Sequence, residues 1–209
     1  MTQAVESGRV ARRTTKGAQR AQQILEVAER LFHRQGYAQT SMEDIARDTG
    51  LLKGSLYYYV NSKEDLLYRV VDDVHEVARA QLDQAKGRED LPPLGRLLLF
   101  VESQVDYNAH HVTRVAVYHH EWHRLEGERK KEVRDKRRAY DAALIDLIEQ
   151  ARSAGEITQA LDTKLAAMSV LAVICWPYTW YRSGTIAPAN LAAFCADFVR
   201  GALGAGRQG

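Results

Sequence analysis

The chain has 209 residues, of which 45% are hydrophobic and 27% charged, a composition typical of a globular protein with a substantial core. Good helix formers dominate and glycine-bounded alternating strands are absent, which predicts an all-α fold of about nine helices and excludes the β-sheet classes. The formal net charge of +2 does not by itself indicate a nucleic-acid-binding protein, so the placement of the charges carries more information.

The first 17 residues are predicted to form a disordered basic arm. Across residues 1–20, cationic side chains outnumber a single Glu6, and they are Arg9, Arg12, Arg13, Lys16 and Arg20. We expect this arm to add sequence-independent attraction to DNA.

Several features predict a cytoplasmic protein with no membrane association. The start of the chain lacks an apolar stretch long enough for a signal peptide, and Pro177 interrupts the longest apolar run. Cys175 and Cys195 show no paired spacing, as expected for buried, reduced thiols.

An amphipathic helix is predicted over residues 18–35, with Gly36 as its left-handed cap. Thr40 and Glu43 have the spacing of a capping box, which predicts a short helix from Met42 to Thr49 that ends at Gly50. A third helix is expected over residues 53–59 and a fourth over 63–86, capped by Asn61 or Ser62.

Residues 87–93 are the expected loop between a small N-terminal and a larger C-terminal part. Further helices are predicted near 94–108, 111–124, 128–153, 161–182 and 188–204, with Pro177 kinking the fourth of these. We divide the chain into the arm (1–17), an N-terminal domain (18–66) and a C-terminal domain (67–209).

Residues 40–63 meet the steric demands of a helix-turn-helix. Ala46 is small where the two helices must cross, and Gly50 permits the positive φ of the turn. Leu56 is apolar where the second helix must be held against the core. The mutual spacing of these residues predicts a helix that enters the major groove of double-stranded DNA.

The second helix and its flanks supply the predicted DNA contacts. Lys53 can hydrogen-bond the O6 and N7 atoms of guanine, whereas hydroxyl groups reach phosphates and set the register. Lys63 begins a helix whose N-terminus favours a phosphate, and Thr40 offers the same on the other flank. The predicted DNA-binding residues are Thr40, Lys53, Gly54, Ser55, Tyr57, Tyr58, Tyr59 and Lys63.

Residues 18–66 resemble the DNA-binding domain of the tetracycline-repressor (TetR) family. The resemblance implies an all-helical homodimer in which a ligand bound to the C-terminal domain changes the spacing of two recognition helices and releases operator DNA. Tyr59 departs from the family pattern, in which many members have a histidine. The resemblance depends on Ile24-Leu25-x-x-Ala28-x-x-Leu31-Phe32-x-x-x-Gly36-Tyr37, Thr40-Ser41-Met42-x-x-Ile45-Ala46 and Gly50-x-x-Lys53-Gly54-Ser55-Leu56-Tyr57-x-Tyr59-Val60-x-Ser62-Lys63-x-x-Leu66-Leu67.

A histidine-rich stretch, residues 118–124, lies in the C-terminal part. His119 and His123 are one helical turn apart and could bind a metal together with Glu121 or His120, but no cysteine or further histidine pair completes a set of four ligands. Residues of this kind more often line a cavity or pack against neighbouring helices. We therefore predict no metal and no cofactor.

Aromatic residues gather around Pro177 and could form a pocket wall or pack the dimer core. Together with His120-Glu121-Trp122 and Tyr140, this stretch resembles the TetR-like regulators of fatty-acid and steroid catabolism, which respond to acyl-coenzyme A thioesters. An acyl-CoA is thus a candidate effector. The candidate pocket residues are His119, His120, Trp122, Tyr140, Trp176, Tyr178 and Trp180.

Two further stretches bear on partners. The charged run from Arg124 to Arg138 is typical of a solvated helix face, although it would also suit the phosphates of coenzyme A. The last two helices carry small and apolar residues over wide arcs, which predicts a homodimer joined through a four-helix interface.

The leading hypothesis is a ligand-responsive transcriptional repressor. An architectural DNA-binding protein without ligand control is one alternative, and it predicts a filled C-terminal core. A metal-dependent enzyme using His119, His123 and Glu121 is another, disfavoured because no nucleophile has a positioned base.

Overall fold

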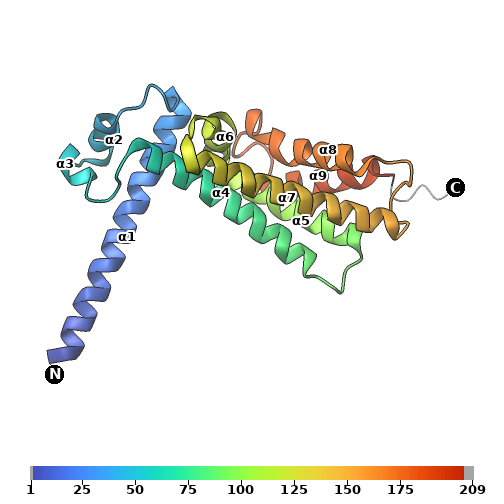
Figure 1. The fold of residues 1–209 in the computed structure, drawn as a ribbon, viewed down its shortest axis with the longest axis horizontal. Coiled ribbons are helices and arrows are strands. Elements are labelled where there is room, and N and C mark those ends of the chain that lie inside the picture. Colours follow the sequence, from blue (N-terminus) through green and yellow to red (C-terminus); the bar gives the residue numbers. More distant parts are fainter. Residues whose placement is uncertain (1, 205–209) are drawn as a thin grey trace. The chain divides into compact units, whose positions relative to one another are not determined.

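The computed structural model describes residues 2–204, with side chains from Lys16 onward. In this part of the chain nine α-helices and two short 3-10 helices form, without any β-strand, so the all-α prediction is confirmed (Figure 1). The elements are α1 (Thr2–Gln35), α2 (Met42–Thr49), α3 (Lys53–Leu56), α4 (Lys63–Lys86), α5 (Pro93–His110), α6 (Val112–Glu121), η1 (Trp122–Arg124), α7 (Gly127–Ser153), α8 (Thr163–Cys175), η2 (Trp176–Thr179) and α9 (Pro188–Ala202).

Helix α1 differs from the prediction at its start. It begins at Thr2 rather than at Ala18, so it includes residues that were expected to form a disordered arm. This segment contains no proline, and its Ala, Arg and Gln residues have high helix propensity, so the helix extends through them towards the N-terminus. At the other end Gly36 has a φ of 83°, as predicted for the left-handed residue that ends the helix.

The chain divides into two compact units. The first extends to Asp72 and also includes Val117–Lys130, and the second comprises Asp73–Ala116 and the chain from Lys131 onward. Helices α4, α6 and α7 therefore each begin in one unit and end in the other. The first unit ends at Asp72, within α4 and before the loop 87–93, and it also includes a segment of the C-terminal half.

The core of the first unit follows the predicted apolar face of α1. Ile24, Ala28 and Phe32 are fully or almost fully buried, together with Ile45 of α2 and Leu66 of α4. Helix α1 packs on α2, and α2 on α3, so the short helices are held by buried side chains rather than by their own length. Phe32 and Tyr37 meet edge to face with their ring centroids 5.2 Å apart.

The second unit is built around α5, which packs against α9, α8 and η2. Its core includes Phe100 and Val101 of α5, Ile174 of α8 and Leu191 of α9. Figure 1 shows α5, α7, α8 and α9 running beside one another in this unit.

Pro177 ends a helix instead of kinking it. The expected helix over 161–182 stops as an α-helix at Cys175 and continues as the 3-10 turn η2. The proline ring excludes the backbone hydrogen bond that a further α-helical turn would need. Beyond the turn Tyr181 is buried, and its hydroxyl donates to the carbonyl of Ile186 at 2.8 Å.

Across the described residues, no helix combines the length and the apolar content that crossing a bilayer requires.

Candidate nucleic-acid interface and effector half

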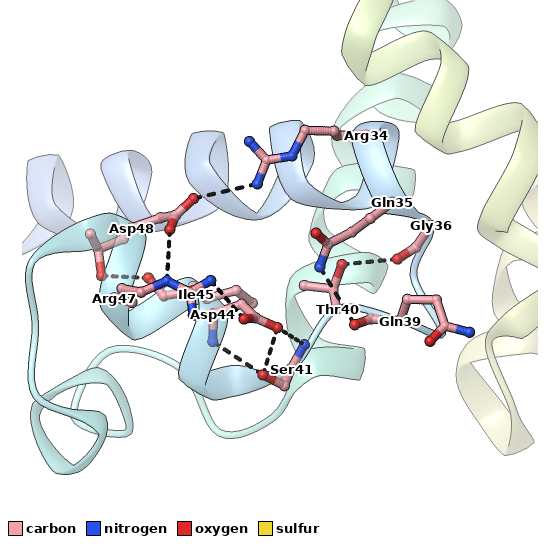
Figure 2. Close-up of polar contacts among 11 residues, drawn as sticks. Arg34, Gln35, Gly36, Gln39, Thr40, Ser41, Asp44, Ile45, Arg47 and Asp48 are labelled. Atoms are coloured by element: carbon pink, nitrogen blue, oxygen red, sulfur yellow. Dashed lines mark hydrogen bonds and ion pairs between the residues drawn. The ribbon is translucent and has the colours of Figure 1, made fainter.

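Helix α2 begins with a capping box formed by Ser41 and Asp44 (Figure 2). The Asp44 amide donates to the Ser41 hydroxyl at 3.1 Å, and the Ser41 amide donates to the Asp44 carboxylate at 3.0 Å. The predicted box of Thr40 and Glu43 is therefore wrong by one residue. Thr40 is buried in the preceding turn, where its hydroxyl donates to the Gly36 carbonyl at 2.9 Å.

The Asp44 carboxylate is held in its charged form. Hydrogen bonds from the side chain and backbone of Ser41, and from Arg47 at 2.7 Å, lower the pKa of Asp44 to about 2. The carboxylate also lies in the first turn of α2, where the helix dipole favours a negative charge. The entry into the helix-turn-helix is thus fixed by ionic as well as neutral hydrogen bonds.

The turn of the helix-turn-helix agrees with the prediction. Ala46 is 4% exposed at the crossing of the helices, and Gly50 has a φ of 67°. The Gly50 amide donates to the carbonyls of Ala46 and Arg47 at the end of α2, and Leu56, the last residue of α3, is fully buried. Helix α3 is shorter than predicted, because Tyr57, Tyr58 and Tyr59 form the turn that follows it.

The outer surface of α3 is unusually open. Gly54 and Ser55 are exposed, and the ring of Tyr58 is 86% exposed. Tyr59 is half-buried and meets Tyr58 edge to face at 5.6 Å. Leu52, which precedes the helix, is 82% exposed although leucine normally packs inside a protein. Sequence reasoning missed Leu52, whose only signal was an apolar residue beside a helix start.

Lys53, the predicted base-reading residue, does not stand alone on this surface. Its ammonium donates to the carboxylate of Glu43 in the first turn of α2. The pairing lowers the pKa of Glu43 and raises the pKa of Lys53, so both groups are charged near neutral pH. Both side chains remain about half exposed.

Lys63 makes contacts that sequence reasoning did not foresee. Its ammonium donates to the carbonyls of Tyr37 and Thr40, each at 2.8 Å, and to that of Ala38 at 3.4 Å. It also lies over the Tyr37 ring, 4.3 Å from the centroid, and burial lowers its pKa. The structure thus places the Lys63 charge on the turn between α1 and α2.

Residues 117–130 belong to the same unit as the helix-turn-helix and bind it through polar contacts. The Glu121 carboxylate accepts from the Tyr37 amide at 3.2 Å, and its side chain is only 14% exposed. Arg129 pairs with Asp65 and Glu64, and the Glu126 amide donates to Glu64 at 3.1 Å. This segment is therefore part of the frame that supports the helix-turn-helix.

The predicted effector residues are divided between the two units. His119, His120 and Trp122 lie in the first, on the segment 117–130. Within the part of the chain that the structure describes, no group of three histidine, cysteine or acidic side chains could hold a metal ion. Glu121, one of the two further ligands that the metal hypothesis offered, accepts from the Tyr37 amide.

The remaining candidates lie in the second unit. Tyr140 packs edge to face on His75 and Phe100, with centroids 5.9 and 6.1 Å away. Trp176 and Trp180 are 64% and 48% exposed. Nearby, burial raises the pKa of Cys175 to about 11, so its thiol stays protonated at neutral pH.

Several residues of the charged run from Arg124 to Arg138 form ion pairs. Beyond the contacts of Arg129, Arg124 pairs with Glu121, and Lys136 pairs with Glu132 and with Glu76 of α4. These contacts give several of its cations a role in holding neighbouring helices.

A line of buried polar groups crosses the core of the second unit. The Gln104 amide donates to the Asn108 side chain at 2.9 Å, and Asn108 donates to the Ile174 carbonyl at 3.0 Å. Gln104 is only 3% exposed, and its own carbonyl oxygen has no hydrogen-bond partner. An orphaned acceptor in a core is costly unless something else donates to it.

Helices α8 and α9 present an apolar surface with a groove of about 410 Å³. Leu165 and Phe198 line it and are 67% and 56% exposed, and Met168 and Phe194 on the same helices are equally open. None of the predicted effector residues lines this groove.

A capped helix-turn-helix with an open second helix, joined to an all-α unit with an exposed apolar helix pair, defines a helix-turn-helix DNA-binding regulator. Residues 24–70 match the family described as bacterial regulatory proteins, tetR family, and residues 90–203 match the tetracyclin repressor-like C-terminal domain. The chain belongs to the TetR family of DNA-binding transcriptional regulators.

The relatives agree with this assignment. The probable regulator ArpR of Pseudomonas putida is 29% identical over 173 residues, covering 78% of this chain and 80% of its own. The repressor KstR2 of Mycobacterium tuberculosis is 28% identical over 169 residues, covering 78% and 81%.

Solved structures share the fold. The ketosteroid regulator KstR2 of M. tuberculosis has a TM-score of 0.83 at 24% identity over 88% of this chain and 95% of its own. AibR, solved with isovaleryl coenzyme A and operator DNA, has a TM-score of 0.75 at 25% identity over 86% and 97%.

Proposed function

We propose that this protein is a homodimeric transcriptional repressor that binds operator DNA and releases it when a small-molecule effector binds. The observation that carries the proposal is the exposed face of α3, set on a buried frame of α1, α2 and α4. Architectural DNA binding without ligand control is the second candidate, and the effector experiment below separates the two.

The proposed DNA contacts lie on α3 and the turn after it. Lys53 reads bases, while Ser55 and the tyrosines Tyr57, Tyr58 and Tyr59 position the duplex through its phosphates. A Cβ atom added at Gly54 would have no other atom of the protein within 4 Å, so internal packing does not require a glycine there. We infer that the missing side chain allows DNA to approach the backbone closely. Thr40 and Lys63 support this face through the bonds described above and are left out as direct contacts.

The role of Lys53 is tested on an operator selected from random duplexes. Lys53→Ala should reduce the preference for operator over scrambled DNA by roughly ten- to hundred-fold, because one base contact is lost. Arg134→Ala, which removes an equal charge from the exposed surface of α7, is the control. Equal discrimination by both variants at every base pair would remove Lys53 from the base-reading set.

Leu52 extends the proposed interface with an apolar contact. A leucine this exposed beside the base-reading lysine can cover the methyl group of a thymine in the major groove. Replacing single operator thymines by deoxyuridine should weaken wild-type binding at one position and leave Leu52→Ala indifferent there. The contact is wrong if both proteins respond alike to every replacement.

Dimerisation through α8 and α9 is supported by their exposed leucine, methionine and phenylalanine side chains. A contiguous apolar surface of this kind marks an interaction site. Two copies would form a four-helix interface, and a dimer would present two recognition helices to successive major grooves.

Effector binding is supported by the orphaned Gln104 oxygen, which can accept from a hydroxyl or amide of a ligand. The ligand in the AibR complex makes acyl-coenzyme A thioesters the first class to test. Tyr140, Tyr178, Trp176 and Trp180 are the effector-binding candidates that we keep, all of them in the second unit.

The effector is sought by titrating acyl-coenzyme A esters and aromatic acids into the operator complex. We expect one class to release DNA, and Gln104→Leu to weaken that response without weakening operator binding. Gln84→Leu, an exposed position on α4, is the control. Failure of every compound to change operator affinity would favour the architectural alternative.

A further inference from the structure

The carboxylate of Glu43 does not form the capping box of α2. That task falls to Asp44, which bonds both the hydroxyl and the amide of Ser41. Glu43 instead reaches the ammonium of Lys53, ten residues along the chain and on the next helix. An acidic side chain has thus been placed against the main cation of a surface that must approach a polyanion.

Stability does not account for this arrangement. The two side chains are 59% and 51% exposed, and an ion pair so open to water adds little to the folded state. The helix dipole favours a carboxylate in the first turn, but Asp44 already supplies one. The consequence of the pair is therefore expected in DNA binding.

We propose that Glu43 is a specificity-determining residue, which pairs with Lys53 so that the lysine strengthens binding to its cognate bases but not to DNA in general. The proposal rests on the DNA-binding role given to Lys53 above. It adds a residue that acts on discrimination by limiting sequence-independent attraction.

The asymmetry comes from the hydrogen-bonding capacity of an ammonium group, which has three donors. At a guanine edge, two donors can reach O6 and N7 while the third stays on Glu43, so the pair persists. At a phosphate, the Glu43 carboxylate repels the negative charge of the phosphate, whereas the guanine O6 and N7 acceptors carry no formal charge. The carboxylate therefore penalises the phosphate contact more than the base contact.

The test measures the affinity of Glu43→Gln for operator and for scrambled duplex over a range of salt concentrations. For scrambled DNA we expect several-fold tighter binding at low salt and a log–log salt slope steeper by about 0.9, the value for one further phosphate contact. Operator affinity should rise less, so the ratio between the two falls. Glu26→Gln removes an equal charge from α1, where the carboxylate accepts from Gln22 and not from a cation.

A double-mutant cycle with Lys53→Met decides whether Glu43 acts through the lysine. In that background Glu43→Gln should change neither the slope nor the ratio, and circular dichroism should show intact helices throughout. An unchanged slope, an effect that persists without Lys53, an equal effect of Glu26→Gln or an equal gain for operator would each overturn the proposal. If the wild-type protein prefers no duplex at all, the proposed function fails first.

Discussion

At the scale of single residues, Asp44 gives the capping box a defined response to pH. Its pKa is about 2 in the folded protein, below the ordinary value of 3.8. A lowered pKa means that the carboxylate stabilises the fold fully above about pH 3.8 and loses this effect as the pH falls towards 2. We expect NMR titration to place the Asp44 carboxyl near the lower value.

Ser41→Ala separates the contribution of the cap from that of Arg47. Without the hydroxyl, the pKa of Asp44 should move towards 3.8, because its largest stabilising contact is gone. Ser55→Ala, on the exposed face of α3, should leave the titration unaltered. A wild-type Asp44 that titrates at its ordinary value would show that the box is not formed in solution.

The residues of the helix-turn-helix could be predicted where local sterics decide them. Ala46, Gly50 and Leu56 occupy positions at which a crossing, a turn or a core accepts few residue types. The cap was ambiguous, because Thr40 and Ser41 are both good caps and each has an acidic residue three positions on. Ser41 rather than Thr40 caps the helix because Thr40 is buried in the preceding turn. The exposure of Leu52 likewise depends on tertiary packing, which the local sequence does not specify.

At the scale of secondary structure, periodicity predicted where most helices lie but not which other segments they contact. The contact between Glu121 and Tyr37 joins residues 84 positions apart. Nothing in the stretch 118–124 indicates such a partner, and its histidines suggested a metal site or a pocket lining instead. The expected α3 helix was too long because the amides of Tyr58 and Tyr59 bond the carbonyls of Ser55 and Leu56, three residues back, so the chain tightens into a turn there.

The support given by Glu121 can be measured as stability. Glu121→Ala leaves the half-buried Tyr37 amide without its acceptor and should lower the free energy of unfolding by about 1–2 kcal/mol. Glu121→Gln keeps a carbonyl oxygen and should cost less. Thermal unfolding and hydrogen exchange at the Tyr37 amide report the change.

The matched control is Glu126→Ala, which removes an exposed carboxylate from the same segment. Its backbone amide, which donates to Glu64, is retained. Equal losses in Glu121→Ala and Glu126→Ala would attribute the effect to charge rather than to the bond with Tyr37.

At the scale of the whole molecule, the all-α class followed from composition, and the two-unit organisation followed only in part. The sequence indicated a DNA-binding part and an effector part with a boundary in a loop. The structure assigns Val117–Lys130 to the first unit, because ion pairs and backbone contacts hold this segment there. Long-range polar contacts of that kind leave no periodic pattern in a sequence.

The exposed apolar surface of α8 and α9 leads us to expect that the protein is a dimer. Burying a phenylalanine is worth about 1.5–3 kcal/mol, and a symmetric dimer buries each such residue twice. Phe198→Glu should therefore weaken dimerisation by about 100-fold or more. Sedimentation should show monomers, and operator affinity should fall because the two half-sites are no longer bound together.

The control for this prediction is Ala142→Glu, which adds the same charge to an exposed position of α7 and should leave the dimer intact. Circular dichroism separates loss of the dimer from loss of the fold, since a folded monomer keeps its helices. A dimer that survives Phe198→Glu together with Leu165→Glu would place the interface on another surface. The open side chains of α8 and α9 would then need a different partner, because an apolar face of that extent is unfavourable in water.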